Sequence, residues 1–101
     1  MCFGAYQTDT QVGFGRVVTD YATFGYVADV FVLPEHRGKG VGRLLIDAML
    51  KHPELAGFRR WLLATKDAHG LYEKLGFRPL AELRDFLTIR RSTPYPGLNV
   101  D

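Results

Sequence analysis

The chain has 101 residues, of which 47% are hydrophobic and 13% aromatic, and it carries a formal net charge of +2. This length and composition predict one globular domain and exclude a disordered chain, while the mild, scattered charge disfavours a nucleic-acid-binding protein. A single cysteine, Cys2, excludes an internal disulfide and favours a cytoplasmic location, and no apolar run is long enough for a membrane span.

The first third of the sequence predicts an antiparallel meander of three strands. An apolar run at 2–6 and a second run at 12–18 flank a polar turn at 8–11, a pattern typical of a β-hairpin. Residues 19–25 then turn the chain into the third strand.

The second strand is predicted to have two different faces. Its large apolar residues are expected together on one face, which carries Val12, Phe14 and Val18. Arg16 interrupts that face. Gly13 and Gly15 share the other face, and glycine inside a strand often marks the close approach of a neighbouring element.

The stretch from residue 27 to residue 51 is the most informative part of the sequence. Residues 27–33 are rich in β-branched and aromatic types and contain one charge, Asp29, so they predict a buried strand that ends at Pro34. A loop with three alternating glycines follows, namely Gly38, Gly40 and Gly42. Basic side chains lie among these glycines, namely Arg37, Lys39 and Arg43.

This loop has the chemistry of an anion-binding site. Glycines let backbone N–H groups approach a ligand, and the first N–H groups of the following helix are unpaired and carry the positive end of the helix dipole. A phosphate or pyrophosphate is therefore the expected ligand. The loop fits neither the dinucleotide fingerprint, because Gly42 comes one position early, nor the P-loop, because Gly40 replaces the hydroxyl residue.

Residues 41–51 predict an amphipathic helix. Apolar side chains recur at helical spacing on one face, namely Val41, Leu44, Leu45, Ala48 and Met49. The opposite face carries Arg43, Asp47 and Lys51, each four residues from the next and therefore able to form ion pairs.

The next part of the chain is expected to complete a βαβ unit. Residues 61–65 predict a strand that runs parallel to the strand at 27–33 through a right-handed crossover. A second helix is then expected to begin after its cap, Asp67, and to end at Gly76.

The C-terminal part is predicted to add two short strands, at 77–80 and 85–90. Residues 92–101 contain two prolines and a glycine and are predicted to form a loose tail. The expected domain therefore spans residues 1–91.

Two motifs in this sequence resemble those of the GCN5-related N-acetyltransferase (GNAT) family. Arg37, Gly40 and Gly42 fill its acyl-CoA signature, which is arginine or glutamine, two residues, glycine, one residue, then glycine or alanine. Residues 71–77, Leu-Tyr-Glu-Lys-Leu-Gly-Phe, resemble the family's second motif and follow in the right order. The resemblance covers residues 2–91.

The resemblance implies an α/β fold with a mixed sheet. An antiparallel meander leads into a parallel βαβ pair, whose two strands splay apart to form the cofactor cleft. Family members usually carry a first strand and one or two helices before the hairpin, and these elements help to wall the acceptor site. They are expected to be absent from this chain.

The resemblance also implies where acetyl-CoA would bind. A backbone N–H near the end of the central strand, at Phe31, Val32 or Leu33, is expected to be left unpaired by a bulge there and to polarise the acetyl carbonyl. The residues expected to hold the pyrophosphate are Arg37, Gly38, Lys39, Gly40, Val41, Gly42 and Arg43. Asp67 stands where the family often has an asparagine that bonds the pantetheine, although it could equally be a plain helix cap.

Tyr72 is expected, by the same resemblance, to lie beside the cofactor sulfur and to protonate the departing thiolate. Its spacing also suits an aromatic residue that only packs on the apolar face of a helix. The general base is open. Asp29 and Glu35 are carboxylate candidates, His36 and His69 titrate in a suitable range, and ordered water is a further alternative. No cluster has metal-ligand spacing, so no metal site is expected.

These observations lead to three hypotheses about function. The first is an N-acetyltransferase that moves the acetyl group of acetyl-CoA to a primary amine by direct attack in a ternary complex, acting as a monomer or a homodimer. The second is a non-catalytic acyl-CoA-binding or regulatory domain that kept the cofactor loop and lost the acceptor site. The third is a nucleotide-phosphate binder unrelated to CoA.

Overall fold

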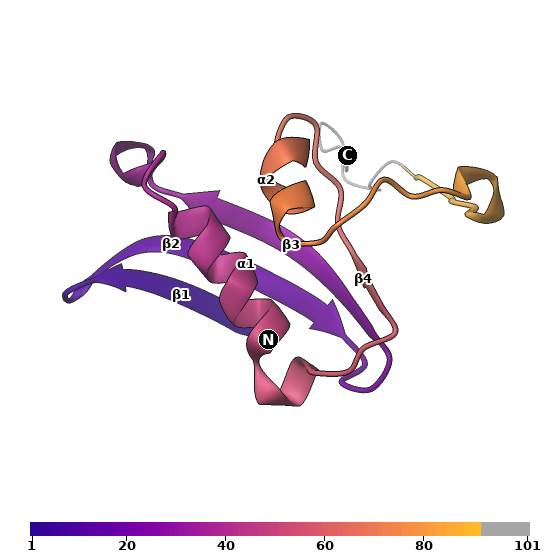
Figure 1. Ribbon diagram of the computed structural model, residues 1–101, viewed down its shortest axis with the longest axis horizontal. Helices are drawn as coiled ribbons and strands as arrows, with labels where there is room; N and C mark the ends of the chain where they lie inside the picture. Colours follow the sequence, from indigo (N-terminus) through magenta and orange to yellow (C-terminus); the bar gives the residue numbers. More distant parts are fainter. Residues whose placement is uncertain (92–101) are drawn as a thin grey trace.

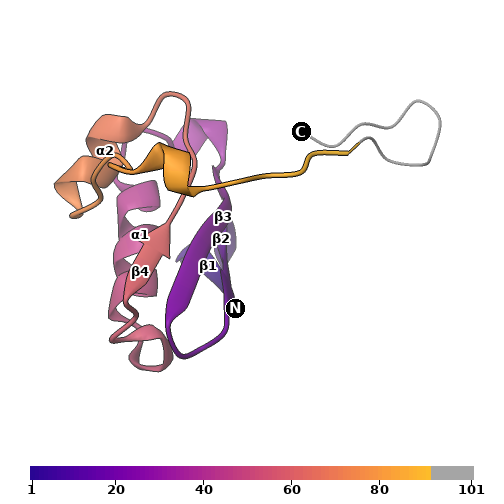
Figure 2. The same cartoon turned by 90° about the vertical axis from the view of Figure 1, so that its right-hand side faces the viewer.

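The computed structural model describes residues 1–91 of the chain. They form a four-stranded mixed sheet in the order β1-β2-β3-β4, with the helices α1 and α2 on one face (Figures 1 and 2). The strands are β1 (Cys2–Gln7), β2 (Thr10–Thr19), β3 (Phe24–Val32) and β4 (Arg60–Leu62). The α-helices are α1 (Val41–Lys51) and α2 (His69–Lys74), and the short 3-10 turns are η1 (Pro34–His36), η2 (Pro53–Leu55) and η3 (Leu83–Asp85).

The predicted sheet topology is confirmed. Strands β1, β2 and β3 pair antiparallel, and β3 pairs parallel with β4. The β3–β4 pairing ends at Tyr26 and Leu62, although β3 continues to Val32. The two parallel strands therefore part towards their carboxyl ends, as the family resemblance implied, and β4 is shorter than expected.

The two predicted faces of β2 pack differently. Val17 is 1% exposed, whereas Val18 is 50% exposed. The core face is the one that carries the two glycines, because α1 lies directly on it. A Cβ atom at Gly13 would lie 3.0 Å from Val41 Cγ1, and a Cβ atom at Gly15 would collide with Met49 Cε. The predicted close approach at these glycines is thus confirmed, and Val17, which is in step with them, is buried.

Helix α1 has the predicted bounds but a different buried face. Leu45, Ile46 and Met49 are buried, whereas Leu44 is 66% exposed, so its expected place in the core was wrong. The helix is rotated so that its contact with the glycine face of β2 centres on Met49. On its polar face Lys51 Nζ lies 2.9 Å from Asp47 Oδ2, which confirms that predicted ion pair.

The core lies between α1 and the sheet. Its buried members are Val17, Val27, Ile46, Met49 and Leu55. Residues of the second half of the chain, including Trp61 and Tyr72, pack against its edge. No helix within residues 1–91 is both long enough and apolar enough to cross a membrane.

Helix α2 is shorter than expected, and its predicted cap was wrong. Its N-cap is Ala68, whose N–H donates to Thr65 Oγ1 at 3.1 Å, and Asp67 lies outside the helix. The predicted end is confirmed. Gly76 has a φ of +103°, and its N–H donates to the carbonyl of Glu73, a C-terminal arrangement that glycine favours.

The two predicted C-terminal strands were wrong. Within the described residues no strand follows Leu62, and the segment after α2 contains only η3. Leu87, for example, is 96% exposed. The alternation of apolar and polar residues at 85–90 is not enough to form a strand, because a strand also needs the edge of a neighbouring strand to pair with. The predicted tail at 92–101 lies outside the described residues.

Candidate functional site

The glycine loop forms the N-terminal end of α1. Gly38 and Gly40 have φ values of +78° and +84°, in the left-handed region that favours glycine, and Gly40 is the N-cap of the helix. No side chain caps this end, so its first N–H groups face the loop. The local backbone is thus the one that the anion hypothesis required.

A cavity of about 270 Å³ opens beside this loop, and we call it the loop cavity. It is lined by Val32, His36, Arg37, Gly38, Gly40, Val41, Gly42, Arg43 and Leu71. Most of the residues predicted to hold the pyrophosphate are therefore brought together. Lys39 is the exception among them, since it lines a neighbouring cavity with Tyr6 and Leu44.

Arg37 is held in place by the end of β3. Its Nε donates to the carbonyl oxygen of Val32 at 2.9 Å, and its guanidinium lies 5.4 Å from the centre of the Phe31 ring. The two Nη groups of the guanidinium take no part in this hydrogen bond. The arrangement fixes a cation at the rim of the loop cavity.

A second cavity, of about 340 Å³, lies where β3 and the segment after β4 part, and we call it the central cavity. It is lined by Val27, Asp29, Val30, Leu63, Ala64, Thr65, Asp67, Ala68 and Tyr72. Three residues singled out from the sequence, Asp29, Asp67 and Tyr72, therefore share one space.

A bulge in β3 shapes this cavity. Arg16 pairs with Ala28 and Phe14 pairs with Phe31, so β3 has one residue more than β2 between these pairs. Asp29 lies in the bulge with a φ of +56°. The bulge was expected near residues 31–33, and this position was wrong. The N–H of Leu33 donates to the carbonyl of Val12 at 2.9 Å and is therefore already paired.

Tyr72 lies in the wall of the central cavity. Its ring packs edge-on against Phe77, with the ring centroids 5.8 Å apart. Burial raises the pKa of the Tyr72 phenol above its ordinary value of 10.0. The phenol is therefore protonated at neutral pH and can donate a proton.

The four candidates for a general base lie in different places. Asp29 shares the central cavity with Tyr72, and its carboxylate lies 2.8 Å from the Arg16 guanidinium. His36 lines the loop cavity, and Glu35 lies exposed in η1 and lines neither of these two cavities. His69 lines a third cavity, between β4 and α2.

Arg16 is the residue whose role the sequence did not reveal. Its charge within an otherwise apolar set of β2 residues was the available signal. Among residues 1–91 no group of three or more His, Cys, Asp or Glu side chains is placed to hold a metal ion.

Comparison with known proteins adds a family to this geometry. The acetyltransferase (GNAT) domain family matches residues 1–79. A crystal structure from Xanthomonas campestris pv. campestris, assigned to the GNAT family, is similar with a TM-score of 0.83 and 51% identity, covering 89% of this chain and 63% of that one.

Two curated relatives extend the comparison. A protein of Gibberella zeae assigned as an acetyltransferase is 44% identical over 77 residues, which are 71% of this chain and 42% of the relative. The thialysine N-epsilon-acetyltransferase of Mus musculus is 30% identical over 95 residues, which are 86% of this chain and 56% of the relative. The chain thus spans about half the length of the curated relatives it matches.

Proposed function

Because the chain belongs to the GNAT family of acetyltransferases, we propose that it transfers the acetyl group of acetyl-CoA to a primary amine by direct attack in a ternary complex. The observation that carries the proposal is the central cavity, which places Tyr72 and Asp29 in one space between the parting parallel strands. Ligands of α/β folds bind beyond the carboxyl ends of such strands.

The loop cavity is the proposed site of the pyrophosphate. The unpaired N–H groups at the start of α1 and the positive end of its dipole favour a doubly charged anion. Arg37 and Arg43 add two full positive charges. From there the pantetheine arm would reach the central cavity, since Leu71 in the wall of the loop cavity is adjacent to Tyr72 in the sequence.

The transfer needs one new bond and two proton movements. The amine nitrogen attacks the thioester carbonyl carbon, the C–S bond breaks, and the nitrogen loses a proton. Tyr72 gives its proton to the leaving thiolate, and Asp29, directly or through water, is the proposed acceptor of the proton from the amine. Asp67 would face the pantetheine as a hydrogen-bond acceptor.

A primary amine is the proposed acceptor class for two reasons. The Mus musculus relative is named for the acetylation of the terminal amine of thialysine, a primary amine. In addition, the carboxylate of Asp29 lies at the central cavity, where it can accept a hydrogen bond from the N–H of a neutral amine. A homodimer and a cytoplasmic location are part of the proposal.

The rival is an acyl-CoA-binding domain without turnover. Calorimetric titration with acetyl-CoA, with ATP and NAD as controls, tests what both hypotheses share, and a nucleotide-phosphate binder would prefer the controls. Release of free CoA in the presence of a panel of primary amines then separates them. Binding of acetyl-CoA without amine-dependent release of CoA would reject the enzyme and retain the binding domain.

A further inference from the structure

A third cavity lies directly behind the central cavity. It has a volume of about 170 Å³, is formed by β4, α2 and the segment after α2, and we call it the side cavity. Leu63, Thr65 and Tyr72 line both the side cavity and the central cavity. These three residues therefore form a common wall, with Tyr72 accessible from both spaces.

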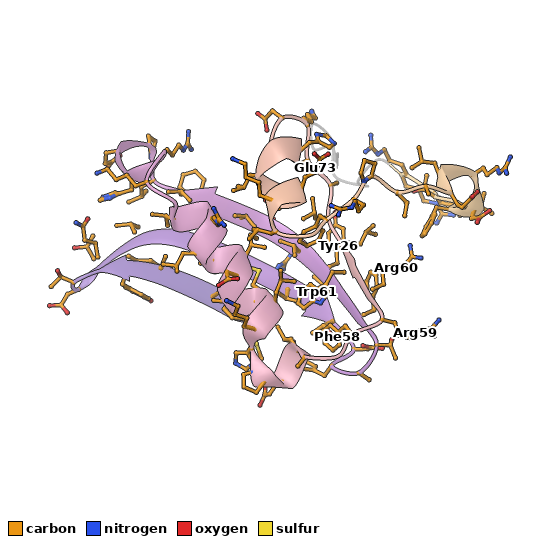
Figure 3. All side chains as sticks on the ribbon, in the orientation of Figure 1. Tyr26, Phe58, Arg59, Arg60, Trp61 and Glu73 are labelled. Atoms are coloured by element: carbon orange, nitrogen blue, oxygen red, sulfur yellow. The ribbon has the colours of Figure 1, made fainter. Side chains whose placement is uncertain are left out.

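The side cavity has an apolar floor and charged walls. Trp61 on β4 and Phe77 after α2 contribute aromatic surface. Two arginines, Arg60 and Arg78, lie at its rim, and Glu73 is the acidic residue that lines it. Figure 3 shows Arg60 and Trp61 on neighbouring positions of β4 and Glu73 on α2.

We propose that the side cavity binds the acceptor, and that the acceptor is a small primary amine that also carries a carboxylate. This inference rests on the proposed function, because it takes the central cavity as the site of the thioester. The amine end would lie at the common wall beside Tyr72, where it meets the thioester and Asp29 of the central cavity. The carboxylate end would lie at Arg60 and Arg78.

The charges at the rim support a carboxylate. Neither Arg60 nor Arg78 takes part in the ion pairs formed among residues 1–91. Arg60 is held by the ring of Phe86, 5.4 Å from its guanidinium, a contact that leaves its N–H groups for a ligand. A guanidinium offers a planar fork of donors that matches a carboxylate, so two of them at one cavity favour an anion.

The size of the side cavity supports a small acceptor. Its volume is below the roughly 300–1,000 Å³ that is usual for drug-sized ligands. An unbranched chain of a few methylene groups would lie along Trp61 and Leu63, with its amine and its carboxylate at opposite ends of the cavity. A bulky amine would project from the side cavity into solvent.

The test uses two amines that differ by the carboxylate alone, 6-aminohexanoate and pentylamine. Trp61 is the single tryptophan of the chain, so its fluorescence reports occupancy of the side cavity. With CoA present, we expect 6-aminohexanoate to bind at least about tenfold more tightly than pentylamine, the effect of one charge-assisted contact. Calorimetry of the same titrations supplies a second readout. Equal affinity of the two amines, or no binding of 6-aminohexanoate by either method, overturns the inference.

Variants locate the contact. Arg78→Gln and Arg60→Gln should each lower the affinity for 6-aminohexanoate about tenfold. The affinities for pentylamine and acetyl-CoA should not change. Arg84→Gln, an exposed arginine that lines no part of the side cavity, is the matched control and should change none of the affinities. Equal losses in all three variants would overturn the inference. If 6-aminohexanoate binds as expected but no amine is acetylated, the proposed enzymatic function is wrong. The assignment of the side cavity as the binding site of an amino carboxylate then still holds.

Discussion

The guanidinium of Arg16 on β2 lies 2.8 Å from the carboxylate of Asp29, in the bulge of β3 that opens the central cavity. Both side chains are about half exposed, so the pair contributes at most about 1 kcal/mol to the free energy of unfolding. Its larger effect is to fix the direction of the carboxylate. The backbone of Asp29 lies in the left-handed region, and its side chain is held by an ion pair. A residue constrained in this way at the edge of a cavity is typical of a functional site.

Asp29→Asn tests Asp29 as the general base. Asparagine tolerates the left-handed backbone and keeps the shape of the side chain, so the fold should persist. If the carboxylate accepts the proton of the amine, kcat should fall by roughly 10² or more, with the affinity for acetyl-CoA unchanged. Steady-state kinetics measure this effect, and Glu35→Gln is the matched control, expected to leave kcat unchanged. Equal losses in the two variants would argue against the assignment to Asp29.

Gly40→Ala tests the loop as the site of the pyrophosphate. A residue with a side chain costs roughly 1–2 kcal/mol in the left-handed conformation of Gly40, so the start of α1 should shift. We expect the affinity for acetyl-CoA to fall about tenfold or more in calorimetry. Gly57→Ala is the matched control, since Gly57 has a φ of +82° and open space around it, far from the loop in sequence. If Gly57→Ala weakens acetyl-CoA as much, the loss reflects general destabilisation.

The order of the strands and the position of the loop could be predicted because they depend on local sequence. Apolar runs and turns define the meander, and the alternating glycines before an amphipathic stretch define the start of α1. The proposal that the loop binds an anion rests on residue types that the sequence shows directly. The sequence did not show that the basic residues of the loop line two cavities, since only the folded chain separates Lys39 from Arg37.

The errors arose where tertiary contacts override the local pattern. Which face of β2 is buried could not be read from the strand itself, because Val17 lies in the core and Val18 does not only since α1 packs on the two glycines. The bulge at Asp29 depends on how β3 pairs with β2, and this pairing cannot be read from the sequence of β3 alone. The segment at 85–90 has the alternation of a strand, but no edge pairs with it within the described residues.

Gly15→Ala tests the close packing of α1 on the sheet. An added methyl group would collide with Met49 Cε, so we expect a loss of about 1–3 kcal/mol in the free energy of unfolding. Gly70→Ala is the opposite case, because Gly70 lies in α2 with nothing within 4 Å of the added atom. There we expect a gain of about 0.5–1 kcal/mol. Urea unfolding of both variants measures these changes, and a neutral Gly15→Ala would mean that Met49 moves aside without cost.

Tyr72→Phe tests Tyr72 as the general acid. The same variant should also change how the stability of the fold depends on pH. If the phenol protonates the thiolate, kcat should fall by roughly 10² while the affinity for acetyl-CoA changes little.

Burial raises the pKa of the Tyr72 phenol in the folded chain above its ordinary value of 10.0, so the folded state holds this proton more tightly than the unfolded state. The associated stability is therefore fully present below pH 10 and is lost as the pH rises towards the pKa of the folded state. Unfolding measured between pH 8 and pH 11 should show a steeper alkaline loss of stability in the wild type than in Tyr72→Phe. Unchanged kcat with this difference in stability would leave Tyr72 as a packing residue and transfer the role of acid to water.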